Sequence, residues 1–183
     1  MSILFINACV RKNSRTLVLA KCILKNMSGD IIEVNLNKEN IPSLNGELLE
    51  KRENLIDSGK MDDPMFNYAW QFAKADEIVI AAPFWDLSFP AILKMYMEQI
   101  TVEGITFDYM GGKPEGFCKA KRLIYVTTSG GEIFADFGYE YIKALAKNFY
   151  GIKETEAHRA MNLDVNRISA EELLTKATIS VIK

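Results

Sequence analysis

Short apolar runs alternate along this chain with longer stretches that have helical periodicity. Segments 3–6 and 78–82 are continuously apolar and 123–127 is apolar up to its last residue, Thr127, which is typical of strands buried on both faces of a sheet. Segment 31–36 alternates enough to predict a partly exposed strand, and 152–158 is a fifth strand candidate. The predicted helices cover 16–27, 46–57, 63–73, 88–100 and 142–149, and a capping box at 169–172 predicts the start of a last one.

This alternation predicts an α/β fold in which a five-stranded parallel sheet carries helices on both faces. Residues 103–120 hold five glycines and prolines, so we expect them to be irregular. No repeat or linker divides the chain, and we expect residues 1–183 to form a single domain.

Composition narrows the function classes. The chain has 183 residues and a net charge of −2, without the basic footprint of a nucleic-acid-binding protein. Its apolar runs are too short to span a bilayer, and its first residues lack the basic leader of a signal peptide, so we expect a cytoplasmic protein. The three cysteines are widely spaced, which predicts free thiols and neither a disulfide framework nor a metal site.

A polar loop, an aromatic loop and a glycine-containing loop follow three of the predicted strands. Ligands of open parallel sheets bind beyond the carboxyl ends of the strands. With the strand order 2-1-3-4-5, the loops 7–16, 83–90 and 127–131 are neighbours. We therefore predict one ligand site where these loops converge.

The first loop leads directly into a helix. Backbone N–H groups at a helix start, together with the hydroxyls of Ser14 and Thr16, suit a phosphate group. The basic residues that add positive charge are Arg11, Lys12 and Arg15. The alternative is that Ser14 only caps the helix. No G-x-G-x-x-G or Walker sequence is present.

The other two loops suit a flat ring. Phe84 and Trp85 could stack on an apolar ring, or they could form core or a dimer patch. Residues 128–131 include two glycines that let backbone amides approach a ligand, although a plain turn is the alternative. The single histidine, His158, has no partner at metal-ligand spacing, and no G-x-S-x-G sequence is present. A site without acid, base or nucleophile predicts that a cofactor carries the chemistry.

Three segments resemble a known family, the FMN-dependent NADH azoreductases and NAD(P)H quinone reductases of flavodoxin-like fold. They are the loop 83–90, the stretch 104–107 followed by 114–116, and the loop 128–131. The resemblance extends from the first predicted strand to about residue 160. It implies a flavodoxin-like three-layer sandwich with strand order 2-1-3-4-5, and a homodimer with FMN at the subunit interface.

The resemblance also implies site residues. The residues implied to hold FMN are Ser14, Arg15, Thr16, Pro83, Phe84, Trp85, Asp86, Leu87, Thr128, Ser129, Gly130 and Gly131. Ser14, Arg15 and Thr16 would hold the phosphate. Phe84, Trp85 and Phe107 would line the substrate pocket, with no catalytic side chain and no metal.

The chain departs from the family at three positions. Ala8 stands where the family usually has a phosphate-binding serine, and Asp86 replaces the usual asparagine. A carboxylate beside the ring would lower the potential of a bound flavin unless it points away. Ser129 stands where arginine is frequent.

The implied activity is a ping-pong transfer of two electrons from NADH or NADPH to quinone, azo or related aromatic acceptors. Two alternatives remain at this point. One is a flavodoxin-type one-electron carrier, although flavodoxins are usually more acidic than this chain. The other is a non-catalytic binding module, because a fold does not fix a function.

Overall fold

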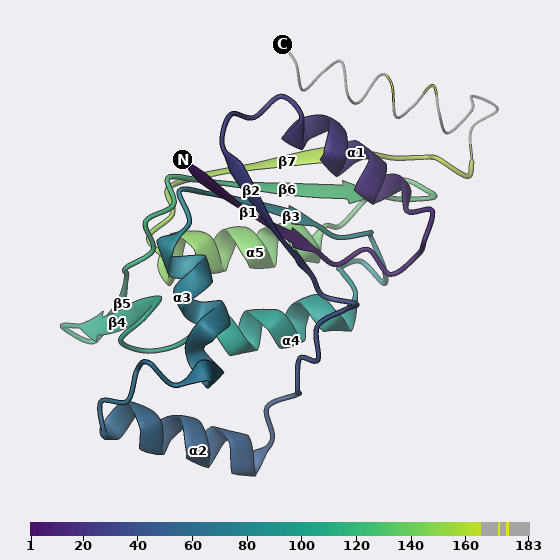
Figure 1. Cartoon of the computed structure of the whole chain (residues 1–183). Coiled ribbons are helices and arrows are strands. Elements are labelled where there is room, and N and C mark those ends of the chain that lie inside the picture. The colour runs from purple at the N-terminus through teal and green to yellow at the C-terminus, as the bar shows by residue number, and fades with distance from the viewer. Residues whose placement is uncertain (166–171, 173–174, 176–183) are drawn as a thin grey trace.

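Five parallel strands form the central sheet of the computed structural model, which describes residues 1–165, 172 and 175 (Figure 1). In spatial order these strands are β2 (Asp30–Asn35), β1 (Ser2–Asn7), β3 (Glu77–Ala81), β6 (Arg122–Thr128) and β7 (Glu154–Ala160). Since β4 (Phe107–Met110) and β5 (Lys113–Gly116) form a separate antiparallel hairpin, the sheet has the predicted order 2-1-3-4-5. The flavodoxin-like α/β fold is thus confirmed.

Helices cover both faces of the sheet, as predicted. Helix α1 (Arg15–Leu24) lies on one face, and α3 (Asn67–Lys74), α4 (Ala91–Ile100) and α5 (Phe137–Asn148) lie on the other (Figure 1). Helix α2 (Gly46–Asp57) lies farthest from the sheet, and none of its residues is buried. A 3₁₀ turn, Pro64–Phe66, precedes α3.

The alternation of side chains along the strands separates the core into two main layers. Phe5 and Val79 face α1, where they pack with Leu19 and Ile23. Their strand neighbours face α3, α4 and α5, in a layer that includes Leu4, Ile6, Ile80, Phe72, Leu93, Tyr96 and Ile142. Continuous apolar runs were therefore the correct indication of strands covered on both sides.

Several element boundaries differ from the prediction. The first helix ends at Leu24, before the predicted limit of 27. The helix predicted from residue 63 begins as the 3₁₀ turn, where the Asp63 carboxylate accepts a hydrogen bond from the Met65 amide at 2.9 Å. The helix predicted from 88 begins only at Ala91, because Pro90 has an extended ψ of 141°.

The irregular segment predicted at 103–120 contains the β4–β5 hairpin. Gly111 and Gly112 both have positive φ angles, 60° and 81°, at the two positions between its strands. Such angles at both central residues define a tight hairpin turn, so these glycines connect the strands. The prediction of irregular structure was wrong for this part of the segment.

Two other predictions concern the C-terminal segment and the membrane. The capping box predicted at 169–172 lies outside the described residues except for Glu172. Within the part of the chain that the structure describes, no helix combines the length and apolar character needed to cross a membrane.

Candidate functional site

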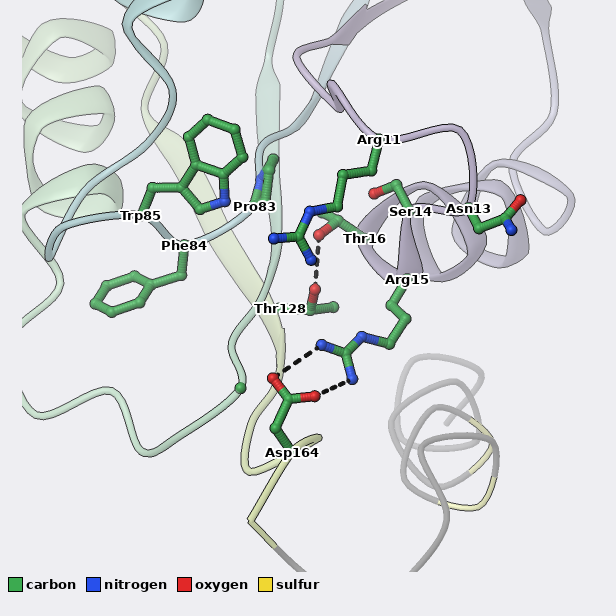
Figure 2. A pocket seen from close by; sticks show the side chains of 11 residues that line it. Arg11, Asn13, Ser14, Arg15, Thr16, Pro83, Phe84, Trp85, Thr128 and Asp164 are labelled. Atoms are coloured by element: carbon green, nitrogen blue, oxygen red, sulfur yellow. Dashed lines mark hydrogen bonds and ion pairs between the residues drawn. The ribbon is translucent and has the colours of Figure 1, made fainter.

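A pocket lies at the carboxyl edge of the sheet, where the loops after β1, β3 and β6 meet. Figure 2 shows its side chains converging from these loops and from the segment after β7. The lining residues are Arg11, Asn13, Ser14, Arg15, Thr16, Pro83, Phe84, Trp85, Thr128, Gly130 and Asp164. Eight of the residues implied to hold FMN are thus brought together: Ser14, Arg15, Thr16, Pro83, Phe84, Trp85, Thr128 and Gly130.

The cationic end of the pocket is the start of α1. The Ser14 hydroxyl caps this helix by accepting a hydrogen bond from the Leu17 amide at 3.2 Å. The amides of Arg15 and Thr16 belong to the first turn, where no helical carbonyl is available to them. Arg11 points into the same pocket (Figure 2). Helix dipole, free amides and guanidinium groups together favour an anion here.

The first loop is held in shape by its own side chains. The Asn7 carboxamide oxygen accepts a hydrogen bond from the Cys9 amide at 3.0 Å, and the Ala8 amide donates to the Ala81 carbonyl at 2.9 Å. Ala8 itself is fully buried in the core layer facing α3 to α5. It is not among the residues that line the pocket.

The floor of the pocket joins the first and third loops. The hydroxyl oxygens of Thr16 and Thr128 lie 2.6 Å apart, and both residues are buried. A hydrogen bond between them ties the first turn of α1 to the end of β6. The spacing of the two loops is therefore set by side chains that themselves belong to the pocket.

The aromatic wall comes from the second loop. Trp85 and Ser88 exchange two backbone hydrogen bonds, 3.1 and 2.7 Å long, around the intervening Asp86 and Leu87. Those two residues have φ angles of 50° and 65°, an arrangement that usually requires glycine or asparagine. The turn leaves Phe84 and Trp85 at the pocket, while exposed Asp86 and half-buried Leu87 lie outside its lining.

The third loop is covered by the chain that follows β7. The Ser129 amide donates to the Ala160 carbonyl at 3.0 Å, and the amides of 162, 163 and 164 donate to the carbonyls of 131, 129 and 130. Ser129 is buried, and neither it nor Gly131 lines the pocket. These backbone hydrogen bonds place Asp164 at the pocket, where its carboxylate forms a bidentate ion pair with the Arg15 guanidinium.

Sequence reasoning missed Asp164. Its position depends on the return of residues 160–164 across the third loop, and no local pattern marks that return. Phe107, by contrast, was predicted to line the substrate pocket but is not among the residues that line this pocket. It lies on the β4–β5 hairpin, where its ring packs against Tyr109 of the same hairpin and Phe149 at the end of α5. Gly116 of this hairpin lies against the backbone of Tyr150 and Gly151, just before β7. Phe107 therefore lies away from the pocket of its own chain, and its part in a substrate pocket remains a prediction that needs a second subunit.

The thiol of Cys9 and the imidazole of His158 lie in partly or fully buried surroundings that favour their neutral forms. Burial raises the pKa of the Cys9 thiol to about 11, so the thiol stays protonated at neutral pH. Burial also lowers the pKa of His158, which lies 3.7 Å from Glu156 on β7. Among the described residues, no cluster of His, Cys, Asp and Glu is placed to hold a metal ion. The pocket thus offers an anion-binding end and an aromatic wall.

Comparison with known proteins gives consistent matches. The model of a family with flavodoxin-like fold matches residues 1–181. An FMN-dependent NADH:quinone oxidoreductase of Clostridium perfringens is 35% identical over 180 residues, which cover 93% of this chain and 90% of that protein.

Solved structures agree on the fold. An FMN-dependent NADH-azoreductase from Bacillus anthracis, solved in complex with FMN, superposes with a TM-score of 0.82 at 25% identity. The match covers 99% of this chain and 96% of that one. Another azoreductase of Bacillus anthracis, 21% identical, has a TM-score of 0.86 with 99% and 96% coverage, and it supports the fold alone.

Proposed function

The chain belongs to the family of flavodoxin-like fold whose model spans it, and we propose that it is an FMN-dependent oxidoreductase that uses NADH or NADPH. The observation that carries the proposal is the pocket itself. The cationic start of α1 and the aromatic residues of the second loop line one pocket at the carboxyl edge of the sheet. The curated relatives are named as FMN-dependent NADH:quinone oxidoreductases, which supports this choice of cofactor and donor.

The residues present fit FMN. A phosphate needs hydrogen-bond donors and positive charge, which the Ser14 hydroxyl, the first amides of α1 and the guanidinium groups of Arg11 and Arg15 supply. A flat ring needs an apolar surface, which Phe84 and Trp85 supply. Gly130, which lines the pocket and has no side chain, leaves backbone at its surface.

Each loop then has a separate task. Ser14, Arg15 and Thr16 bind the phosphate, and Thr128 fixes the distance between that end and the third loop through its bond to Thr16. Of the third loop, Gly130 lines the pocket and would offer its amide to the ring edge, whereas the Ser129 amide and the carbonyls of 129–131 already bond to residues 160–164. Pro83, Phe84 and Trp85 orient the ring and exclude water from one side of it.

When bound, FMN would supply the redox chemistry, a ping-pong exchange of hydride from NADH or NADPH followed by two-electron reduction of the acceptor. Quinones, azo compounds and related aromatic molecules are the acceptor classes that we propose. Their flat rings suit a space bounded by Phe84 and Trp85. No side chain of the pocket needs to act as acid or base in this proposal.

We further propose that the chain acts as a cytoplasmic homodimer in which the second subunit brings Phe107 to the pocket. Within one subunit Phe107 is only 7% exposed and packs on the hairpin. Trp85 is 37% exposed, which leaves part of its ring free for a partner or an acceptor.

Steady-state kinetics of the FMN-loaded protein tests the proposal. Initial rates of NADH oxidation should depend on menadione, and double-reciprocal plots at several menadione concentrations should be parallel, as a ping-pong sequence requires. Bound FMN without NADH oxidation would favour the one-electron carrier. Failure to bind FMN would favour the non-catalytic module.

A further inference from the structure

An acidic side chain lies in a pocket that is otherwise built for an anion. The Asp164 carboxylate accepts hydrogen bonds from both terminal nitrogens of Arg15, at 2.7 and 3.2 Å, and Figure 2 shows the pair at the pocket. Arg15 also donates to the Leu163 carbonyl at 3.3 Å. The guanidinium assigned to the phosphate is thus already bound to a carboxylate of the same chain.

Residues 160–164 are held in place without this ion pair. Three backbone hydrogen bonds, from the amides of Asn162, Leu163 and Asp164, already fix the segment on the third loop at 2.9–3.2 Å. The side chain of Asp164 is 63% exposed, and ion pairs at such exposure contribute little to stability. A role in folding therefore does not account for the carboxylate at this position.

Backbone geometry directs the carboxylate into the pocket. A Cβ atom built on Gly130 would collide with the carboxylate of Asp164, so the absence of a side chain at 130 makes room for it. Arg15 holds the pKa of Asp164 below its usual value, with a further contribution from Arg11. The group is consequently ionised throughout the physiological pH range.

We propose that Asp164 is a specificity-determining residue that competes with the phosphate of a flavin nucleotide for Arg15, and so weakens the binding of FMN relative to flavin without phosphate. A phosphate and a carboxylate are both anions that bind a guanidinium through two oxygens. When the phosphate takes Arg15, the carboxylate loses its partner and remains close to a second negative group. This inference rests on the proposed function, since FMN is the nucleotide concerned.

The test compares Asp164→Asn with the unmodified chain, both freed of flavin, by fluorescence titration with FMN and with riboflavin. Asparagine has the same shape without the charge. The variant should bind FMN about tenfold more tightly, since it loses a competing charge-assisted pair. Riboflavin has the same ring and no phosphate, so its affinity should not change. The gain for FMN should shrink at high salt, which screens the repulsion.

Two further variants locate the effect. Glu132→Gln removes an exposed negative charge just beyond the third loop, outside the pocket lining, and should leave the FMN affinity unchanged. In an Arg15→Gln background, Asp164→Asn should have a much smaller effect, because the two residues act on the phosphate together.

Three results would overturn the inference. The first is an FMN affinity that does not change in Asp164→Asn. The second is weaker FMN binding by this variant, which would mean that the carboxylate positions Arg15 for the phosphate. The third is a gain in riboflavin affinity equal to the gain in FMN affinity.

A titration with inorganic phosphate distinguishes a failure of this inference from a failure of the proposed function. If neither protein binds any flavin, the proposed function fails. A larger phosphate-induced rise in Tm for Asp164→Asn than for the unmodified chain would then support the competition, and equal rises would overturn it.

Discussion

The hydroxyl oxygens of Thr16 and Thr128 lie 2.6 Å apart at the floor of the pocket, although 111 residues separate them along the chain. Both residues are buried, with exposed fractions of 1% and 7%. One belongs to the first turn of α1 and the other ends β6. The contact therefore links the anion-binding end of the pocket to the loop that we propose faces the flavin ring.

Breaking this contact from one side should destabilise the protein. Thr16→Val leaves the buried Thr128 hydroxyl without its partner, at a cost of about 1–2 kcal/mol in the free energy of unfolding. Adding Thr128→Val removes the orphaned group, so the double variant should be more stable than the sum of the single losses predicts. Urea denaturation of the four proteins measures this coupling. Strictly additive losses would show that the hydroxyls do not interact.

Ser14 can be tested for two roles at once. Ser14→Ala should lower the free energy of unfolding by about 1 kcal/mol, because the Leu17 amide loses its cap. Aspartate caps helices as well as serine does, so Ser14→Asp should keep the stability. Its negative charge should nevertheless weaken FMN binding strongly. If Ser14→Asp bound FMN like the unmodified chain, Ser14 would be a cap and not part of the phosphate site.

Much of this architecture could be predicted from the sequence because it depends on local patterns. The largely apolar segments at 78–82 and 123–127 mark buried strands, and the aromatic and glycine-containing loops that follow them mark the ligand edge. Gly111 and Gly112 are a typical hairpin turn sequence, but the hairpin 107–116 was missed because its strands are only four residues long and the second contains Pro114 and Gly116. Asp164 depends on contacts between distant segments, which no local pattern reports. The single domain over 1–183 stays a prediction.

The turn at Asp86 and Leu87 should reveal backbone strain. Alanine at position 86 would have to keep a φ of 50°, which costs alanine about 1–2 kcal/mol, whereas glycine adopts this angle freely. Asp86→Ala should therefore be about 1 kcal/mol less stable than Asp86→Gly. Thermal unfolding of the two variants gives the comparison. Equal stability would mean that the turn relaxes to a negative φ.

The negative charge of Asp86 should have little effect on the midpoint potential of bound FMN. Its side chain is exposed and lies outside the pocket lining, which favours the arrangement in which the carboxylate points away from the ring. Asparagine tolerates the same backbone conformation. The midpoint potential of FMN bound to Asp86→Asn should stay close to that of the unmodified chain in an anaerobic dye titration. A clear rise in potential would place the carboxylate beside the flavin.

Thiol reactivity should follow burial. Burial raises the pKa of Cys9 to about 11 and that of Cys118 to about 12, so at pH 8 both are almost entirely protonated and react slowly with iodoacetamide. Cys22 and Cys118 are both half-buried, and Cys22 should be alkylated first because the raised pKa of Cys118 keeps that thiol protonated. Peptide mass spectrometry after a short exposure identifies the modified site. Rapid alkylation of Cys9 in the folded protein would contradict the buried, protonated state of its thiol.

The most direct test of the central claim is a two-step anaerobic experiment on the FMN-reconstituted protein, freed of unbound flavin. Addition of NADH should bleach the visible flavin absorption, and later addition of menadione without further NADH should restore it. This outcome requires that the pocket holds FMN and that electrons pass through it in two separate half-reactions. A protein that retains no flavin, or whose bound flavin NADH does not bleach, would contradict the assignment of this pocket to an FMN-dependent oxidoreductase.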